Sequence, residues 1–251
     1  MERTFALLEL VADRGGATAR ELADELGLPL STVYRLAADL VARDYLLHLR
    51  HEGRFELGFK PHRLGLALHR QIGLSAHVRQ RVVDLHRATG CAAYLAIRRG
   101  ATLALIFVAD SPECPRLEPM TFGFHEAPHA TAFGKILLAD LDDTERQVEL
   151  ARYGLPALTP RTITDAGVLE AHLARVLRRG VAWEFEEFQP GSSCAAVAVR
   201  RPDLGLLGCV AVSAGASRFD GPDLRIEHRL RVAAGDVAAY FRRGDPGVLT
   251  Q

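Results

Sequence analysis

The chain has 251 residues, 48% hydrophobic and 25% charged, which is an ordinary composition for a globular protein of two modest domains. Its 31 basic and 31 acidic residues give a formal net charge of zero, which excludes bulk attraction to membrane surfaces or polyanions. There is no signal-type apolar segment at the N-terminus, and residues 204–217, the longest uncharged stretch, are too few to span a bilayer. Four cysteines without CxxC spacing and ten irregularly spaced histidines predict a cytoplasmic protein with free thiols, no metal site and no cofactor.

Residues 17–45 have the pattern of a helix-turn-helix. Thr18 and Glu21 form a T-x-x-E capping box, which satisfies two backbone N–H groups at the start of a helix. Gly27 ends that helix after two turns, and Pro29 leads into a second one. Two short helices joined by a glycine turn also occur in domains that do not bind DNA, so the assignment depends on the segments around it.

The second helix has one apolar and one polar face, and its expected N-cap is Ser31 or Thr32. Apolar residues recur at the spacing of a buried helix face: Val33, Leu36, Ala37, Leu40 and Val41. The opposite face carries hydroxyls, an aromatic ring and a guanidinium: Ser31, Thr32, Tyr34 and Arg35. Such a face suits a recognition helix in the DNA major groove.

A β-hairpin is expected next, because residues 45–49 and 54–59 are apolar runs separated by the turn residues 50–53. An earlier helix is predicted from Phe5, Leu8, Val11 and Ala12, and it ends at Gly15-Gly16. Three helices and a hairpin with a basic tip are typical of a winged helix-turn-helix, which we expect over residues 1–60. The expected DNA contacts are Thr18, Arg20, Ser31, Thr32, Tyr34, Arg35, Arg50 and Arg54.

The net charge of this segment does not by itself favour nucleic acid. Residues 1–60 contain eight basic and ten acidic side chains, which leaves a net charge of −2. Contact with phosphates would therefore depend on the local placement of Arg20, Arg35, Arg50 and Arg54. A single weakly charged surface binds DNA poorly, so we expect at least a dimer that offers two such surfaces.

The rest of the chain predicts a linker helix and an α+β domain. Residues 61–74 contain Gly65 and Gly73 and predict a linker helix that bends easily; a helix over 75–89 follows and ends at Gly90. Strands are expected at 91–98, 102–108, 181–186, 194–200 and 206–213, and helices at 130–139, 142–152, 165–179 and 223–243. Strands joined as hairpins and flanked by helices predict an antiparallel sheet in a domain over residues 75–251.

Seven segments in order resemble the isocitrate-lyase-regulator (IclR) family of bacterial transcription factors. They are ELADELGLPLSTVYRLAADLVARDYL, RFELGFKPHRLG, LAIRRG, PHATAFGKILLA, GLPALTPRTIT, RRGVAWEFEEFQPGSSCAAVAVR and AVSAG. The resemblance implies a winged helix-turn-helix, a linker helix and a C-terminal GAF/profilin-like effector domain with a six-stranded antiparallel sheet. It also implies homodimers or homotetramers on a palindromic double-stranded operator, and a small-molecule effector.

The resemblance implies ligand contacts at positions that match those of the family: Ala132, Phe133, Glu184, Cys194, Ala211 and Ser213. The helix that begins near Thr131 has N–H groups without intrahelical partners, so the carboxylate of a small organic acid can dock there. Gly134 and the neighbouring alanines are expected to let the backbone approach the ligand.

Two of these positions depart from the family pattern. Phe133 adds a ring where the family often has a small pair, and Ala211 replaces a frequent serine, which argues against a hydrophilic effector such as glyoxylate or pyruvate. Aromatic residues surround the matched positions: Phe122, Phe124, Phe133, Trp183, Phe185 and Phe188. Most large apolar side chains form core, but two or three of these at the site would favour an aromatic or partly apolar acid.

An enzyme is the alternative from a different class, with the winged helix used for protein contacts. Cys194 and His129 would then be a nucleophile and its base in a hydrolase, and Glu186 and Glu187 acid–base carboxylates. However, adjacent residues on a strand point to opposite faces, and no third group that would orient the histidine is recognisable. Lys135 is expected to be a solvated helix lysine rather than a ligand anchor. We therefore expect a ligand-responsive transcriptional regulator, with repression favoured over activation.

Overall fold

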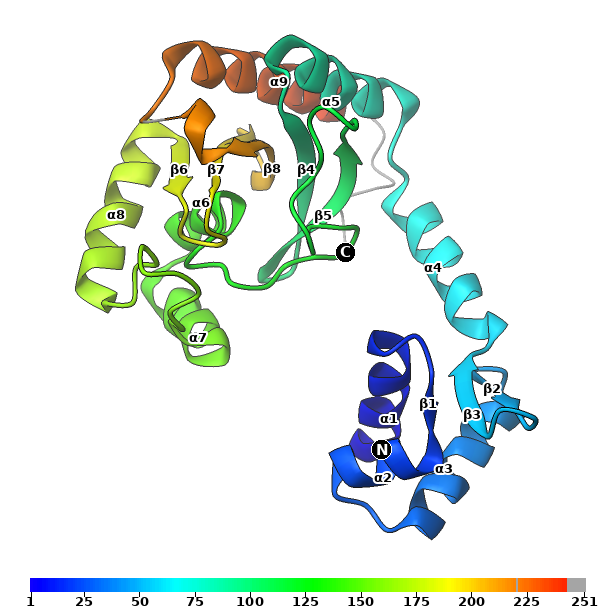
Figure 1. Ribbon diagram of the computed structural model, residues 1–251. Coiled ribbons are helices and arrows are strands. Elements are labelled where there is room, and N and C mark those ends of the chain that lie inside the picture. Colours follow the sequence, from blue (N-terminus) through cyan, green and yellow to red (C-terminus); the bar gives the residue numbers. More distant parts are fainter. Residues whose placement is uncertain (220, 243–251) are drawn as a thin grey trace. The chain divides into compact units, whose positions relative to one another are not determined.

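The computed structural model describes residues 1–219 and 221–242, and the chain divides into two compact units (Figure 1). The first unit runs from Met1 to Gly73, and the second begins at Leu74. The predicted last helix reached Arg243, which lies outside the described residues. Along the part of the chain that is described, no helix is both long and apolar enough to cross a membrane.

The first unit is a winged helix-turn-helix followed by one further helix. Its elements are α1 (Glu2–Asp13), β1 (Ala17–Thr18), α2 (Ala19–Leu26), α3 (Leu30–Ala42), β2 (Leu46–Leu49), β3 (Arg54–Leu57) and α4 (Phe59–Ile72). The three short strands form an antiparallel sheet in the order β1-β3-β2. The hairpin of β2 and β3 confirms the predicted wing, whereas the two-residue strand β1 was not expected.

The core of this unit follows the predicted periodicity, with two corrections. Leu22 of α2 and Val33, Leu36, Ala37 and Leu40 of α3 are buried, as expected. Phe5, one of the residues from which α1 was predicted, lies outside its buried face and is 53% exposed; Leu7 and Val11, one helical turn apart, are the buried residues of α1. Ser31 and Thr32 are not the N-cap of α3, because the helix begins at Leu30 and Pro29 is its N-cap. The Pro29 carbonyl accepts hydrogen bonds from the N–H groups of Thr32 and Val33.

The linker helix α4 begins at Phe59, two residues before the predicted start. Pro61 is tolerated because it lies in the first helical turn, where its missing N–H has no intrahelical acceptor. The start of α4 is fixed to the turn before β2: Gly58 donates its N–H to the Tyr45 carbonyl, and Lys60 donates to the Asp44 carbonyl, each at 2.9 Å. A Cβ at Gly58 would clash with the Asp44 carbonyl oxygen, so this contact requires glycine.

The second unit is an α+β domain built on an antiparallel sheet. Its helices are α5 (Ala76–Thr89), α6 (Ala132–Asp140), α7 (Asp143–Tyr153), α8 (Ala166–Arg179), a 3₁₀ turn η1 (Ala216–Arg218) and α9 (Leu224–Arg242). Its strands are β4 (Ala92–Arg99), β5 (Thr102–Ala109), β6 (Val181–Phe185), β7 (Ser192–Arg201) and β8 (Gly205–Gly215). Within the described residues the sheet has five strands in the order β5-β4-β8-β7-β6, which corrects the six that the family resemblance implied.

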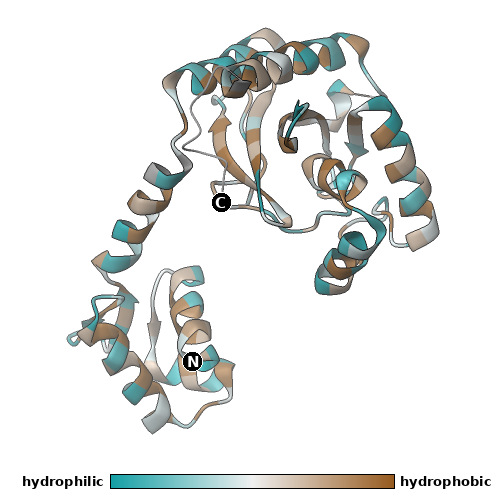
Figure 2. Cartoon of the chain, turned by 180° about the vertical axis from the view of Figure 1, so that it is seen from behind, coloured by the Kyte–Doolittle hydropathy of each residue, from teal (hydrophilic) through white to brown (hydrophobic). Residues whose placement is uncertain are grey.

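Helices cover both faces of this sheet. Helices α5 and α9 pack on one face, and α6, backed by α8, packs on the other (Figure 1). The strands are therefore apolar on both faces, and those of the sheet are largely brown in Figure 2. Small residues dominate the face toward α6: Ala92, Ala96, Ala182, Ala196 and Ala211. This face also carries the residues that were expected to contact an effector.

Candidate DNA interface and effector site

The exposed face of α3 carries the predicted DNA-contacting groups. Ser31, Tyr34 and Arg35 are exposed and Thr32 is half-buried, all on the side of the helix away from its buried residues. The Tyr34 ring meets the Phe55 ring of β3 edge-on, with 6.4 Å between the centroids. The aromatic group on this face is therefore held against the wing.

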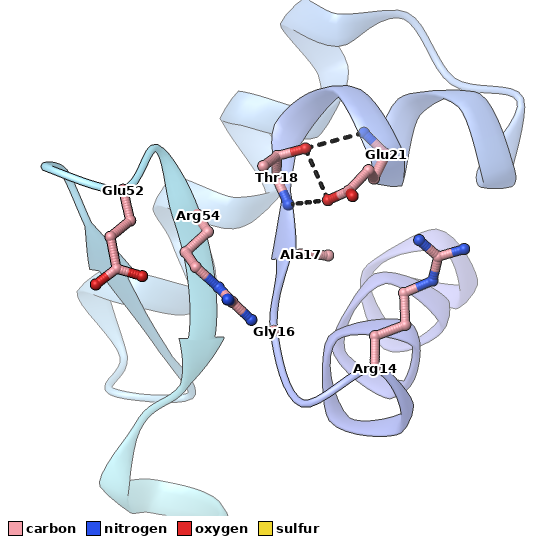
Figure 3. A pocket seen from close by; sticks show the side chains of 7 residues that line it. All are labelled: Arg14, Gly16, Ala17, Thr18, Glu21, Glu52 and Arg54. Carbon is pink, nitrogen blue, oxygen red and sulfur yellow. Dashed lines mark hydrogen bonds between the residues drawn. The ribbon is translucent and has the colours of Figure 1, made fainter.

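Three further residues were expected to contact DNA: Thr18, Arg20 and Arg54. They differ in whether their side chains already have partners within the protein. Arg20 is exposed on α2. The Thr18 hydroxyl is used as the helix cap: it accepts from Glu21 N–H (3.3 Å), and the Glu21 carboxylate accepts from Thr18 N–H (2.7 Å; Figure 3). Arg54 reaches inward from β3 toward Gly16 (Figure 3). Its Nη2 donates to the Gly15 carbonyl at 3.1 Å, and its Nε lies 3.5 Å from Glu56. Arg54 thus links the wing to the turn after α1, while Arg50 is exposed at the wing tip.

In the second unit, the start of α6 has N–H groups without intrahelical acceptors. Thr131 is the N-cap: its hydroxyl accepts from Gly134 N–H and donates to the Ala127 carbonyl, each at 3.2 Å. The first intrahelical bond is Lys135 N–H to the Thr131 carbonyl (2.9 Å), so the N–H groups of Ala132 and Phe133 have no acceptor within the helix. Gly134 was expected to make room for a ligand, and this reason is wrong. A Cβ there would clash with Pro128, so the glycine makes room for the chain's own backbone rather than for a ligand.

Three of the predicted effector-contacting residues lie in one row across the sheet. Glu184 on β6 pairs with Cys194 on β7, which pairs with Ser213 on β8. All three side chains are buried, and Ala211 lies two residues before Ser213 on the same face. The structure therefore brings the predicted residues of β6, β7 and β8 together beneath α6.

Tyr94 on β4 pairs with Ala211 of β8, one position along from this row, and its side chain reaches Ser213; no prediction from the sequence included it. Its hydroxyl shares a 2.7 Å hydrogen bond with Ser213 Oγ and accepts from Leu117 N–H at 3.0 Å. Burial raises the pKa of this phenol, so it stays protonated. The register of β4 against β8 places Tyr94 beside Ser213, and no local sequence motif predicts this position.

Lys135 is completely buried and forms an ion pair with Glu187, so the expectation of a solvated lysine is wrong. The reason is that α6 has no wet face: every residue from Ala132 to Ala139 is buried between the sheet and α8. Burial lowers the pKa of Lys135, and the neighbouring Glu187 opposes that shift. The absence of charged residues from α6 before Asp140, other than Lys135 itself, was the available signal.

Glu184 is fully buried next to this pair. Its Oε2 accepts from the N–H groups of Glu187 (2.9 Å) and Phe188 (3.4 Å). Its Oε1, like Glu187 Oε2, has no hydrogen-bond partner in the part of the chain that the structure describes. Burial raises the pKa of Glu184 to about 7. This carboxyl group is therefore partly protonated near neutral pH and can either donate or accept a hydrogen bond.

The aromatic residues divide between the two faces of the sheet. Phe124 meets Phe133 of α6 at 5.9 Å and Phe188 at 5.6 Å between centroids, and all three lie on the α6 side. Trp183 and Phe185 alternate with Glu184 along β6 and stack on each other on the opposite side, at 5.5 Å. A ring cluster therefore borders the row of Glu184, Cys194 and Ser213, without Trp183 or Phe185.

The groups considered for catalysis do not form a nucleophile–base pair. Burial raises the pKa of the Cys194 thiol well above its usual range, so the thiolate is suppressed. His129 Nε2 lies 3.0 Å from the Pro156 carbonyl oxygen, and burial lowers the pKa of the ring. Glu186 and Glu187 diverge to Arg161 and Lys135, respectively. Across the described ranges, no group of three or more His, Cys, Asp or Glu residues could hold a metal ion.

Two family models match the two units. The IclR helix-turn-helix domain matches residues 1–49, and the C-terminal region of the bacterial transcriptional regulator IclR matches residues 67–239. The chain belongs to the IclR family. This IclR-family protein is a ligand-responsive, DNA-binding transcriptional regulator and not an enzyme.

Relatives and solved structures agree over nearly the full length. The HTH-type transcriptional regulator BhcR of Paracoccus denitrificans is 30% identical over 245 residues, covering 97% of this chain and 84% of BhcR. The HTH-type transcriptional repressor AllR of Salmonella typhi is 28% identical over 225 residues, covering 87% and 80%. The crystal structure of an IclR homologue from Microbacterium hydrocarbonoxydans, complexed with 4-hydroxybenzoate, has a TM-score of 0.76 at 19% identity, covering 96% of this chain and 99% of that one. That structure supports the fold.

We expect Arg35→Ala to weaken binding to the operator by about 1–3 kcal/mol if its guanidinium pairs with a base edge, because a bidentate contact contributes about that much. Gel-shift titration on the chain's own upstream DNA measures the loss. Arg43→Ala, at the C-cap of α3, is the matched control. Unchanged operator affinity in a correctly folded Arg35→Ala variant would contradict the assignment.

The pKa of Glu184 predicts how stability depends on pH. Because its folded-state pKa is raised from 4.5 to about 7, the stabilising effect of its proton is complete below about pH 4.5 and is lost as pH rises through 7. This loss of unfolding free energy is on the order of 3 kcal/mol. Glu184→Gln resembles the protonated form, so its stability should not decline in this way as pH rises. Urea unfolding followed by the fluorescence of Trp183, the only tryptophan, measures the difference between pH 5 and pH 8.

Glu170→Gln, at a side chain that is 52% exposed, is the control for that experiment and should keep the wild-type decline. If Glu184→Gln declines in parallel with wild type, Glu184 is not the titrating group.

Proposed function

We propose that this regulator is a repressor whose effector is a small organic acid with an apolar or aromatic body, bound on the α6 side of the sheet. The observation that carries the proposal is a pair of buried carboxylate oxygens, Glu184 Oε1 and Glu187 Oε2, that have no hydrogen-bond partner within the described residues; Glu187 is ion-paired with Lys135 of α6. A buried polar atom without a partner costs about 1–3 kcal/mol. A ligand that donates hydrogen bonds to these atoms would recover that free energy.

The chemistry of the site supports one orientation of such an acid. Its carboxylate would accept from the N–H groups of Ala132 and Phe133 beside the Thr131 cap, where the helix dipole favours negative charge. Its apolar body would lie by the rings of Phe133, Phe124 and Phe188, and Cys194 and Ala211 would line the wall. A hydroxyl on the effector would bond to Glu184, and Ser213 would add its own hydroxyl.

The Microbacterium homologue provides an analogy for this chemistry. Its ligand, 4-hydroxybenzoate, combines a carboxylate, a ring and a hydroxyl. Repression is supported by the names of relatives such as AllR. Both likenesses support the proposal.

For the operator we propose that Ser31, Thr32 and Arg35 of α3 contact base edges in the major groove, with Tyr34 alongside. Arg20 and Arg50 would contact phosphates, and Thr18 and Arg54 would contribute mainly by holding α2 and the wing. We take residues 1–60 as the DNA-binding domain, 61–74 as the linker and 75–251 as the effector-binding and oligomerisation domain.

The weak charge of the DNA-binding domain, whose net charge is −2, supports a homodimer or homotetramer. Helix α4 offers a surface for it, since Phe59 is 77% exposed and Leu64 and Leu66 are also exposed. Exposed apolar side chains on a helix are typical of an interface between subunits.

We expect Ser213→Leu to abolish the effector response while operator affinity stays within about twofold, because the two sites lie in separate units and a bulky apolar group would fill the site. The measurement is a gel shift on the upstream DNA in the presence of benzoate or 4-hydroxybenzoate. Ser217→Leu, at an exposed serine of η1, is the control variant for each acid. A normal response of Ser213→Leu would place the effector elsewhere. Release by aliphatic acids alone would contradict an aromatic body.

We expect sedimentation of the full chain to give at least a dimer. Phe59→Glu together with Leu64→Glu should shift it toward the monomer and lower operator affinity at least about tenfold, since each half-site then binds alone. A wild-type monomer that binds a half-site tightly would refute the requirement for two subunits.

A further inference from the structure

A cavity lies in the effector domain, on the side of β6 and β7 that faces away from α6. Its volume is about 480 Å³, and it is lined by Arg161, Phe185, Glu186, Ser193, Ala216 and Phe219. We propose that this cavity is a second binding site, which takes a small aromatic carboxylate independently of the effector site proposed above.

Strand alternation separates the two sites. Glu184 and Cys194 face α6, whereas their neighbours Phe185 and Ser193, which pair with each other across β6 and β7, face the opposite side. The walls of this cavity are aromatic: Phe185 stacks on Trp183, and Phe219 meets Trp183 edge-on, both at 5.5 Å between centroids. A flat apolar ring is the ligand surface that such walls suit.

Ser193 provides a polar group that lacks a partner. The residue is 1% exposed, and its Oγ has no hydrogen-bond partner among the residues that the structure describes. The adjacent Ser192, by contrast, donates from Oγ to the Gln189 carbonyl at 2.8 Å. Since a buried hydroxyl normally finds a partner, Ser193 is suited to hydrogen-bond a polar substituent of a ligand.

Arg161 provides the positive charge at the rim. Its loop is fixed to the segment after β6, because Thr159 and Thr162 donate from Oγ1 to the carbonyls of Glu186 and Glu187, each at 2.6 Å. The guanidinium uses Nη1 for its ion pair with Glu186 (3.2 Å), and its fork has five N–H donors in all.

The pair of Arg161 and Glu186 is weak enough to admit a carboxylate. The Arg161 side chain is 64% exposed, and an exposed ion pair contributes little to stability. The other carboxylate oxygen of Glu186 accepts a hydrogen bond from Gly191 N–H at 3.1 Å, so Glu186 keeps a partner without Arg161. A ring carboxylate can therefore bind the remaining donors of Arg161 while its ring lies against Phe185 and Phe219. A volume of about 480 Å³ lies within the range of small-molecule sites.

The test uses Trp183, the only tryptophan of the chain, whose ring stacks on the cavity wall. Titration of the full-length protein with benzoate should give a saturable change in Trp183 fluorescence, and benzamide, an uncharged analogue, should need at least about fivefold more ligand. Arg161→Gln should raise the half-saturating benzoate concentration about fivefold, since a charge-assisted hydrogen bond is lost at an exposed rim. Arg178→Gln, an exposed arginine of α8, is the matched control.

Two further variants separate this site from the proposed effector site. Ala216→Leu should fill the cavity and abolish the change, with Ser217→Leu as its control, while Ser213→Leu should leave the change intact. A change that is lost in Ser213→Leu and unaffected by Arg161→Gln and Ala216→Leu would overturn the inference, as would equal binding of benzamide or no saturable change. Failure of the proposed function would appear separately, as operator binding that no acid relieves.

Discussion

The geometry of the effector domain depends on the buried ion pair between Lys135 and Glu187. It joins the middle of α6 to the segment after β6, and the removal of one partner would leave a buried charge uncompensated, at a cost of about 3–5 kcal/mol. Glu187 also donates its N–H to Glu184, so the pair fixes the carboxyl group that begins the polar row across the sheet. The position of the helix N-terminus relative to this row therefore depends on a contact between two residues 52 positions apart.

Room for these buried polar groups comes from the small residues of the sheet. Alanines on β4, β6, β7 and β8 face α6, which lets an entirely buried helix lie close to the strands. Close packing also holds within the sheet, because a Cβ at Gly208 would clash with the Ala96 carbonyl oxygen of the neighbouring strand. The opposite face has large side chains such as Trp183, whose Nε1–H donates to Glu227 of α9 at 2.9 Å.

Local patterns predicted the elements and their order, and tertiary contacts explain what they missed. The Thr18–Glu21 capping box, the wing and the strands of the second unit were predictable, since each depends on residues near one another in the chain. The N-cap of α3 was not, because Pro29 serves through its backbone carbonyl. The burial of Lys135 and the place of Tyr94 were missed because each depends on a partner distant in sequence. The row of Glu184, Cys194 and Ser213 came from a family resemblance, and the strand register explains why these positions are neighbours.

The capping box of α2 affects how the DNA-binding domain responds to ionic strength. The Glu21 carboxylate lies at the N-terminal end of α2, where a DNA phosphate could otherwise dock, and its hydrogen bonds with Thr18 lower its pKa and keep it charged. Each phosphate that a protein neutralises releases counterions and steepens the salt dependence of binding by about 0.9 in the double-logarithmic slope. A domain with a net charge of −2 and an anion at this helix end displaces few counterions. We therefore expect weak binding to bulk genomic DNA, with recognition depending on the base edges that α3 is proposed to contact.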